Sequence, residues 1–205
     1  MIADLAIKYD LYVITDEVYE HILYKPHEHV YMATLPGMRE RTVICSSLSK
    51  TYAITGWRIG YVIANPEVTD RVKKVHDFLT IGAAAPLMEA VVVGLNFGDE
   101  YYRQLQAHYT HMRELFTGGL RSIGLSFVEP QGAYYVMVDI IEFGYTDDYL
   151  FCEDLARKVG VGAVPGSSFF KEDVNNYIRF HFAKQDETLK QALERLADIR
   201  SKMRR

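Results

Sequence analysis

The stretch SSLSKTYAITGWRIGYVIA, residues 46–64, contains a hydroxyl-rich turn with a cation at each end. Lys50 lies among three serines, and Arg58 follows eight residues later, directly after the only tryptophan of the chain. The apolar runs TVICSS (42–47) and RIGYVIA (58–64) flank the turn and predict two strands. Such turns are usually plain loops, but cations and hydroxyls together also suit a phosphorylated ligand. The rest of the sequence decides between these interpretations.

Outside this stretch, apolar runs that predict strands alternate with periodic segments that predict helices. This alternation is typical of an α/β fold. The short run LYVIT predicts a buried strand that stops at an acidic cluster, and Asn65-Pro66 predicts a capped helix start. Besides the two strands above, we expect strands at 11–15, 125–129, 133–140, 161–165 and 176–183, and helices at 66–79, 86–97, 99–124, 147–160 and 186–205.

Composition excludes several classes of function. The chain has 205 residues, 49% of them apolar and 24% charged, as in an ordinary globular protein. Its net charge of −4 is scattered, which argues against nucleic acid or an anionic membrane as a partner. No apolar run reaches the roughly 20 residues of a membrane helix, and no signal peptide is expected. Cys45 and Cys152 form no metal or redox motif and predict buried, reduced thiols in a cytoplasmic protein.

The first ten residues, MIADLAIKYD, predict a crossover helix that leads into the strand at 11–15. A parallel sheet that contains this strand needs partner strands, and few precede the long helix at 99–124. The sequence is therefore typical of the second half of a larger fold.

Polar side chains follow the first two strands of the predicted sheet. Asp16 comes directly after LYVIT, and TVICSS leads to Ser47, Ser49 and Lys50. In open α/β sheets, ligands bind beyond the carboxyl ends of parallel strands. If these strands are parallel neighbours, an acid and a lysine face one cleft. The alternative is that Asp16 caps a short helix beginning at Glu17 and that Lys50 is solvated.

Two arginines are candidates for binding anions. Arg58 stands after Gly56, which suits a bend, and its guanidinium can hold an anionic group by two bonds. Arg179 lies in NYIRFHFA, whose alternation also allows a solvated position. The alternative for either arginine is an ordinary surface position.

The histidines do not form a metal site by spacing. His27 and His29 form one pair and His108 and His111 another, but neither has a third ligand at suitable spacing. We expect all four to be ordinary surface residues and predict no metal.

Four motifs occur in one order along the chain. They are DEVY (16–19), SSLSK (46–50), TGWRIG (55–60) and YIR (177–179). Together they resemble the pyridoxal-phosphate aminotransferases of class I and II, which have fold type I, and the resemblance runs through almost the whole chain. It implies an incomplete cofactor-binding α/β sheet domain at 1–97 and a small α/β (α+β) C-terminal domain at 98–205.

The resemblance implies a role in cofactor binding for five residues. Lys50 resembles the lysine that forms a Schiff base with pyridoxal phosphate and then moves the substrate proton. Asp16 resembles the aspartate that keeps the ring nitrogen protonated, and Tyr19 the tyrosine that bonds the ring oxygen. Ser47 and Arg58 resemble phosphate ligands.

The resemblance also implies the substrates and their contact. Arg179 resembles the arginine that binds the substrate carboxylate, so the expected substrates are an L-amino acid and a 2-oxo acid. The family implies a homodimer, and the branch most resembled holds kynurenine, glutamine, methionine, aromatic and some aspartate aminotransferases. Two alternatives stay open: a truncated, non-catalytic module or pseudoenzyme of this family, and a pyridoxal-phosphate lyase or synthase of the same fold.

Overall fold

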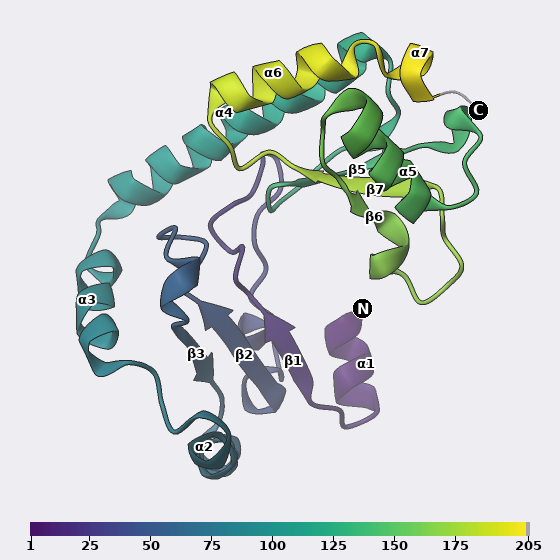
Figure 1. Cartoon of the computed structure of the whole chain (residues 1–205). Helices are drawn as coiled ribbons and strands as arrows, with labels where there is room; N and C mark the ends of the chain where they lie inside the picture. The colour runs from purple at the N-terminus through teal and green to yellow at the C-terminus, as the bar shows by residue number, and fades with distance from the viewer. Residues whose placement is uncertain (204–205) are drawn as a thin grey trace. The chain divides into compact units, whose positions relative to one another are not determined.

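The computed structural model describes residues 1–203, which form two compact units, one of residues 1–105 and one that begins at Gln106 (Figure 1). The division between these units falls inside the long helix α4 (Asp99–Ile123). The α/β fold class is confirmed, because both units combine helices with a sheet. The assignment of a cofactor domain and a small domain stays a prediction.

Unit 1 contains a three-stranded sheet of β1 (Val13–Asp16), β2 (Thr42–Ser47) and β3 (Gly60–Ile63), in the order β1-β2-β3. The three strands predicted in this part of the sequence are confirmed. β1 and β2 run parallel, and β3 is antiparallel to β2. The carboxyl ends of β1 and β2 therefore meet at one edge, where Asp16 and the turn after Ser47 lie.

Helices of unit 1 begin and end close to the predicted positions. The side chain of Asn65 accepts a hydrogen bond from the Val68 amide (2.9 Å), so it caps the helix that Pro66 opens, as predicted. This helix has no buried side chain, and Phe78 near its end is 92% exposed. The elements are α1 (Ile2–Lys8), α2 (Pro66–Thr80), α3 (Ala85–Leu95) and short 3₁₀ helices at Met32–Thr34, Arg39–Arg41 and Thr55–Trp57.

A small apolar cluster supports the turn of residues 46–64. Leu48 and Ile59, one at each end of the turn, pack with Val91 of α3. All three are less than 9% exposed. Both ends of the turn are thereby fixed by burial. Between them Ser49 and Thr51 are buried as well, Lys50 is half-buried, and Thr55 and Arg58 are exposed.

Gly60 has no room for a side chain, and this predicts a loss of stability on substitution. A Cβ atom there would lie 2.7 Å from the carbonyl oxygen of Ser46 on the neighbouring strand. We expect Gly60→Ala to lower the free energy of unfolding by about 1–3 kcal/mol, measured by urea denaturation. Gly56→Ala is the control, because no described atom lies within 4 Å of that position. Equal urea concentrations at the unfolding midpoints of the two variants would contradict the prediction.

Unit 2 contains a four-stranded antiparallel sheet in the order β4-β5-β7-β6. The four strands predicted here are confirmed, although each is shorter than predicted. The long helix α4 and the later helix α6 lie side by side (Figure 1), and His111 of α4 pairs with Asp186 of α6 at 2.8 Å. The elements are β4 (Phe127–Val128), β5 (Tyr135–Asp139), β6 (Val164–Pro165), β7 (Tyr177–His181), α5 (Asp148–Asp154), α6 (Asp186–Leu196) and α7 (Ile199–Met203), with 3₁₀ helices at Ile141–Phe143 and Gly166–Phe169.

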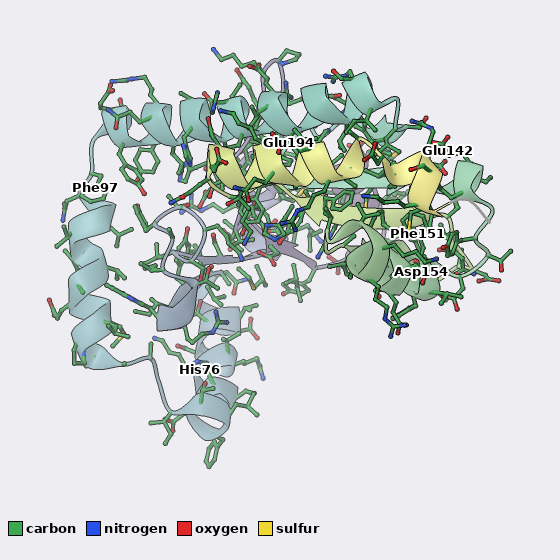
Figure 2. The ribbon with its side chains drawn as sticks, turned by 45° about the horizontal axis from the view of Figure 1, so that its top comes forward. His76, Phe97, Glu142, Phe151, Asp154 and Glu194 are labelled. Atoms are coloured by element: carbon green, nitrogen blue, oxygen red, sulfur yellow. The ribbon has the colours of Figure 1, made fainter. Side chains whose placement is uncertain are left out.

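The two faces of this sheet differ. Ile178 and Phe180 of β7 are buried, and the Phe180 ring meets the ring of Phe116 on α4, with 5.8 Å between centroids. Arg179, between them in the strand, therefore projects from the opposite face. Phe151 on α5, labelled in Figure 2, is fully buried and completes the core of this unit.

Two helices of unit 2 differ from the sequence prediction. The helix predicted at 147–160 is α-helical only to Asp154 and continues as a π-helical turn, Leu155–Val159, which Gly160 ends in the left-handed conformation. The terminal helix predicted at 186–205 is wrong as one element, since α6 stops at Leu196 and α7 begins at Ile199. Beyond the break, Arg200 of α7 bonds the Ile123 and Gly124 carbonyls and the Glu142 carboxylate. Residues 204–205 of the predicted helix lie outside the described residues.

Neither cysteine forms a disulfide, and both thiols are free. Cys152 is buried as predicted, whereas Cys45 is only half-buried. Burial, with the negative charge of Asp148, raises the pKa of the Cys152 thiol to about 12. Within residues 1–203, every helix is too short or too polar to cross a membrane.

Candidate active site

A cavity of about 560 Å³ lies at the carboxyl ends of β1 and β2 in unit 1. It brings together one carboxylate, two cations and several hydroxyls from three separate segments of the sequence. The lining residues are Ile14, Thr15, Asp16, Val18, Cys45, Ser46, Ser47, Ser49, Lys50, Thr55, Arg58, Ile59 and Gly60. The prediction that an acid and a lysine face one cleft is confirmed.

Asp16 ends β1 opposite Cys45 of β2, and its side chain is exposed at the cavity. Its Oδ1 accepts a hydrogen bond from the Val18 amide at 3.2 Å. The segment after it is a turn and not a helix. The alternative that Asp16 caps a helix starting at Glu17 is therefore wrong; the carboxylate instead closes a local turn.

Lys50 is half-buried, and its Nζ lies 5.9 Å from the centroid of the Tyr19 ring. Tyr19 itself is not part of the cavity lining. On the amino side of Lys50, the Ser49 amide donates to Ser47 Oγ (3.3 Å). On its carboxyl side, Tyr101 of α4 donates to the Thr51 carbonyl (2.6 Å). Bonds on both sides thus restrict the backbone that carries the amine.

Arg58 has a strained backbone. Its φ of 55° and ψ of 48° are left-handed, which is uncommon for a residue other than glycine, asparagine or aspartate. Its Nη1 donates to the Thr55 carbonyl at 2.8 Å, so the side chain folds back over the turn. Strain of this kind costs about 1–3 kcal/mol and concentrates at ligand-binding sites. The conformation keeps the guanidinium at the cavity.

Glu20 contacts a residue of the cavity lining, Ser46, and no motif of the sequence predicts this role. Glu20 accepts hydrogen bonds from Tyr31 (2.7 Å), Tyr61 (3.3 Å) and Ser46 (3.5 Å), and so ties the turn after Asp16 to β2 and β3. Burial raises the pKa of Tyr61; Ser46 opposes this shift and Glu20 adds to it. The available signal was the run DEVYE, which holds three acids although only one was assigned.

His29 is not the surface residue that the sequence predicts. Its Nε2 contacts Oε2 of Glu17, whose side chain is 5% exposed, and its own side chain is 23% exposed. The pairing partner lies twelve residues away, so no local pattern could reveal it. Among the described residues, no group of three or more His, Cys, Asp or Glu side chains suits a metal ion.

Unit 2 contains a second candidate site around Arg179. The guanidinium carbon lies 4.1 Å from the centroid of the Tyr135 ring and 3.8 Å from that of Phe169. A cavity of about 300 Å³ lies beside it, lined by Tyr134, Tyr135, Val164, Arg179, Phe180 and His181. Within residues 1–203 no carboxylate pairs with this arginine. The alternative of a fully solvated side chain is wrong, because Arg179 is half-buried between aromatic rings.

His181 also belongs to the lining of this second cavity. Burial, then the cations of Lys184 and Arg179, lower the pKa of its imidazole below the ordinary value of 6.5. These surroundings favour the neutral imidazole, and Arg179 contributes the guanidinium of this lining.

The family model described as aminotransferase class I and II matches residues 1–196. The chain belongs to this aminotransferase family. The resemblance drawn from four short motifs is confirmed, and with it the prediction of an enzyme family that works in amino-acid metabolism.

Similar proteins of this family act on different amino acids. The chain is 35% identical to a probable N-succinyldiaminopimelate aminotransferase of Mycobacterium tuberculosis, covering 96% of this chain and 52% of that protein. It is 35% identical to a methionine aminotransferase of Escherichia coli, covering 93% and 50%. A kynurenine–oxoglutarate transaminase of Dictyostelium discoideum is 32% identical, with 97% and 51% covered.

Solved structures give the same result. The M. tuberculosis N-succinyldiaminopimelate aminotransferase superposes with a TM-score of 0.91 at 36% identity, over 96% of this chain and 52% of that one. An aromatic aminotransferase of Pyrococcus horikoshii gives 0.89 at 33% identity, over 97% and 53%. The aminotransferase chain described here thus spans about half the length of the relatives it matches.

Aminotransferases of this family use pyridoxal phosphate, and the residues of the first cavity fit that group. The cofactor presents an aldehyde, a basic ring nitrogen and a phosphate. The cavity offers an amine at Lys50, a carboxylate at Asp16, and a guanidinium at Arg58 with the hydroxyl of Ser47 beside the turn. Each part of the cofactor thus has a chemically matched partner among the lining residues.

Proposed function

We propose that the protein containing this chain transfers an amino group from an L-amino acid to a 2-oxo acid, with pyridoxal phosphate held covalently by Lys50. The observation that carries the proposal is the single cavity lined by Asp16, Ser47, Lys50 and Arg58. When bound, the cofactor supplies an electron-withdrawing ring that accepts charge from the α-carbon of the substrate.

Lys50 has two tasks in this proposal. Its amine would hold the cofactor, and the same amine would serve as the base that accepts the proton from the α-carbon of the substrate and gives it back. The bonds that fix Ser49 and Thr51 on either side restrict where the amine can move. A base held in one place contributes to the rate mainly through proximity.

The other residues orient and charge the ring. The carboxylate of Asp16 would keep the ring nitrogen protonated, because a nearby negative charge favours the charged form of a base. Tyr19 would donate to the ring oxygen. Arg58 and Ser47 hold the phosphate by charge-assisted and neutral hydrogen bonds, respectively.

Arg179 of unit 2 binds the substrate carboxylate in this proposal. Its half-buried guanidinium without an acidic partner among residues 1–203 supports that role, since such a cation favours an anionic ligand. The homodimer implied by the family and the cytoplasmic location expected from the two unpaired cysteines belong to the same proposal.

A titration tests the proposed function. We expect pyridoxal phosphate added to the 205-residue chain to give the near-visible absorbance of a lysine adduct, which borohydride fixes and peptide mapping places at Lys50. Pyridoxal without phosphate is the matched control ligand and should bind at least tenfold more weakly, since it lacks the contacts to Arg58 and Ser47. An adduct spread over exposed lysines, or equal affinity for both ligands, would contradict the proposal.

A further inference from the structure

Asp148 is a buried acid that the proposed function does not use. It is 1% exposed and stands at the first position of α5. The helix is already capped by the preceding residue, Asp147, which accepts from the Tyr149 and Leu150 amides. Asp148 instead reaches a segment 19 residues later: its two oxygens accept from the Ser167 amide (2.7 Å) and the Ser167 hydroxyl (2.9 Å).

Ser167 belongs to the short segment Gly166–Phe169 between β6 and β7, and this segment is anchored at more than one point. A Cβ atom at Gly166 would lie 2.4 Å from the carbonyl oxygen of Tyr177, so only glycine permits this close approach to the start of β7. The hydroxyls of Ser168 and Tyr149 lie 3.0 Å apart. Among these contacts of the segment, the two hydrogen bonds to Asp148 involve a carboxylate and are the most buried.

The last residue of the segment is Phe169, whose ring lies 3.8 Å from the guanidinium carbon of Arg179. The second ring at this arginine is that of Tyr135 on β5. In the sheet β7 lies between β5 and β6, so the two rings come from opposite sides of β7. Aromatic faces attract a guanidinium and limit its rotation, while its N–H edge stays available to a planar anion. The orientation of Arg179 therefore depends on where the segment holds Phe169.

We propose that Asp148 is a positioning residue: its two bonds to Ser167 hold Phe169 against Arg179 and thereby set the preference of this site for carboxylate ligands. The inference rests on the proposed role of Arg179. Because Asp148 touches neither ligand nor cofactor in this scheme, its removal changes the discrimination between ligands and not the attachment at Lys50.

The first test observes the contact itself. NMR of the chain labelled at arginine measures the ring-current shift of the Arg179 side-chain protons, and Phe169→Leu gives the value without the ring. We expect Asp148→Ala, which removes both bonds, to move the shift most of the way to that value and Ser167→Ala, which retains the bond of the amide, to move it part of the way. Glu153→Gln, an exposed acid on the same helix, is the control and should leave it unchanged. A wild-type shift in Asp148→Ala would overturn the inference.

The second test measures ligand preference. The ratio of the dissociation constants of 3-phenylpropionate and its neutral amide measures the preference for a carboxylate. Arg179→Gln gives the value of this ratio when the arginine is absent. We expect Asp148→Ala to reduce the preference for the carboxylate about tenfold and Ser167→Ala, which retains one bond, by less. A reduced ratio in Arg179→Gln with a wild-type ratio in both other variants overturns the role of Asp148 alone. An unchanged ratio in Arg179→Gln overturns the proposed role of Arg179.

Discussion

Lys50→Ala is expected to abolish every borohydride-reducible adduct of pyridoxal phosphate with this protein. In the proposed function the amine of Lys50 is the only group of the cavity that forms a covalent bond with the cofactor aldehyde. The remaining contacts of Arg58, Ser47 and Asp16 are non-covalent, so the variant should still bind the phosphate part of the cofactor, at lower affinity. The measurements are near-visible absorbance and mass after reduction.

Two further variants separate the possible reasons for such a loss. Lys50→Arg keeps a cation at the cavity but forms no adduct, and we expect it to be as unreactive as Lys50→Ala. Lys25→Ala removes an exposed lysine of the same unit and should react like the wild type. A reducible adduct that persists in Lys50→Ala and maps to one other lysine would refute the assignment of the covalent anchor.

Arg179→Gln is expected to weaken amino-acid binding by about 2–3 kcal/mol, roughly 30- to 150-fold, because it removes one charge-assisted, two-pronged contact. Cofactor affinity should change little, since the proposed cofactor ligands all belong to unit 1. The experiment compares the amino-acid dependence of the cofactor spectrum in wild type and variant with direct titration of the cofactor.

Arg179→Lys is the matched variant, because it retains the charge but not the planar fork. We expect it to recover only part of the affinity, since an ammonium neither forms two parallel bonds nor stacks equally well between Tyr135 and Phe169. Equal losses of amino-acid and cofactor affinity in Arg179→Gln would instead assign this arginine to the stability of unit 2.

The elements around the cavity were predictable because their signals are local. The run TVICSS forms β2 at its predicted residues, and Asn65-Pro66 opens α2 as predicted. Parallel pairing of β1 and β2 then follows from the fold class. The antiparallel direction of β3 does not, because an apolar run predicts a strand but carries no information about its direction.

What the sequence did not predict depends on contacts between distant residues. Nothing near His29 indicates that it contacts the buried carboxylate of Glu17, and nothing near Phe169 indicates that its ring lies on Arg179. Apolar and aromatic residues have the same local pattern whether they fill a core or line a ligand site. The same holds for the acids Glu17, Glu20 and Asp148, whose partners are distant in the sequence, so the sequence alone could not assign a role to them.

The uneven burial of apolar side chains has a consequence for local unfolding. Most buried apolar side chains belong to unit 2, whereas in unit 1 the helix α2 buries none and Ile14 of β1 is 73% exposed. Segments with little buried apolar surface open at low free energy, so we expect amide protons of α2 to exchange with solvent before those of the β5–β7 ladder. A ligand that binds only the folded state raises the free energy of unfolding by about 2.7 kcal/mol when its free concentration is 100 times its dissociation constant. In unit 1 the cofactor would therefore act as a folding partner as well as a reagent.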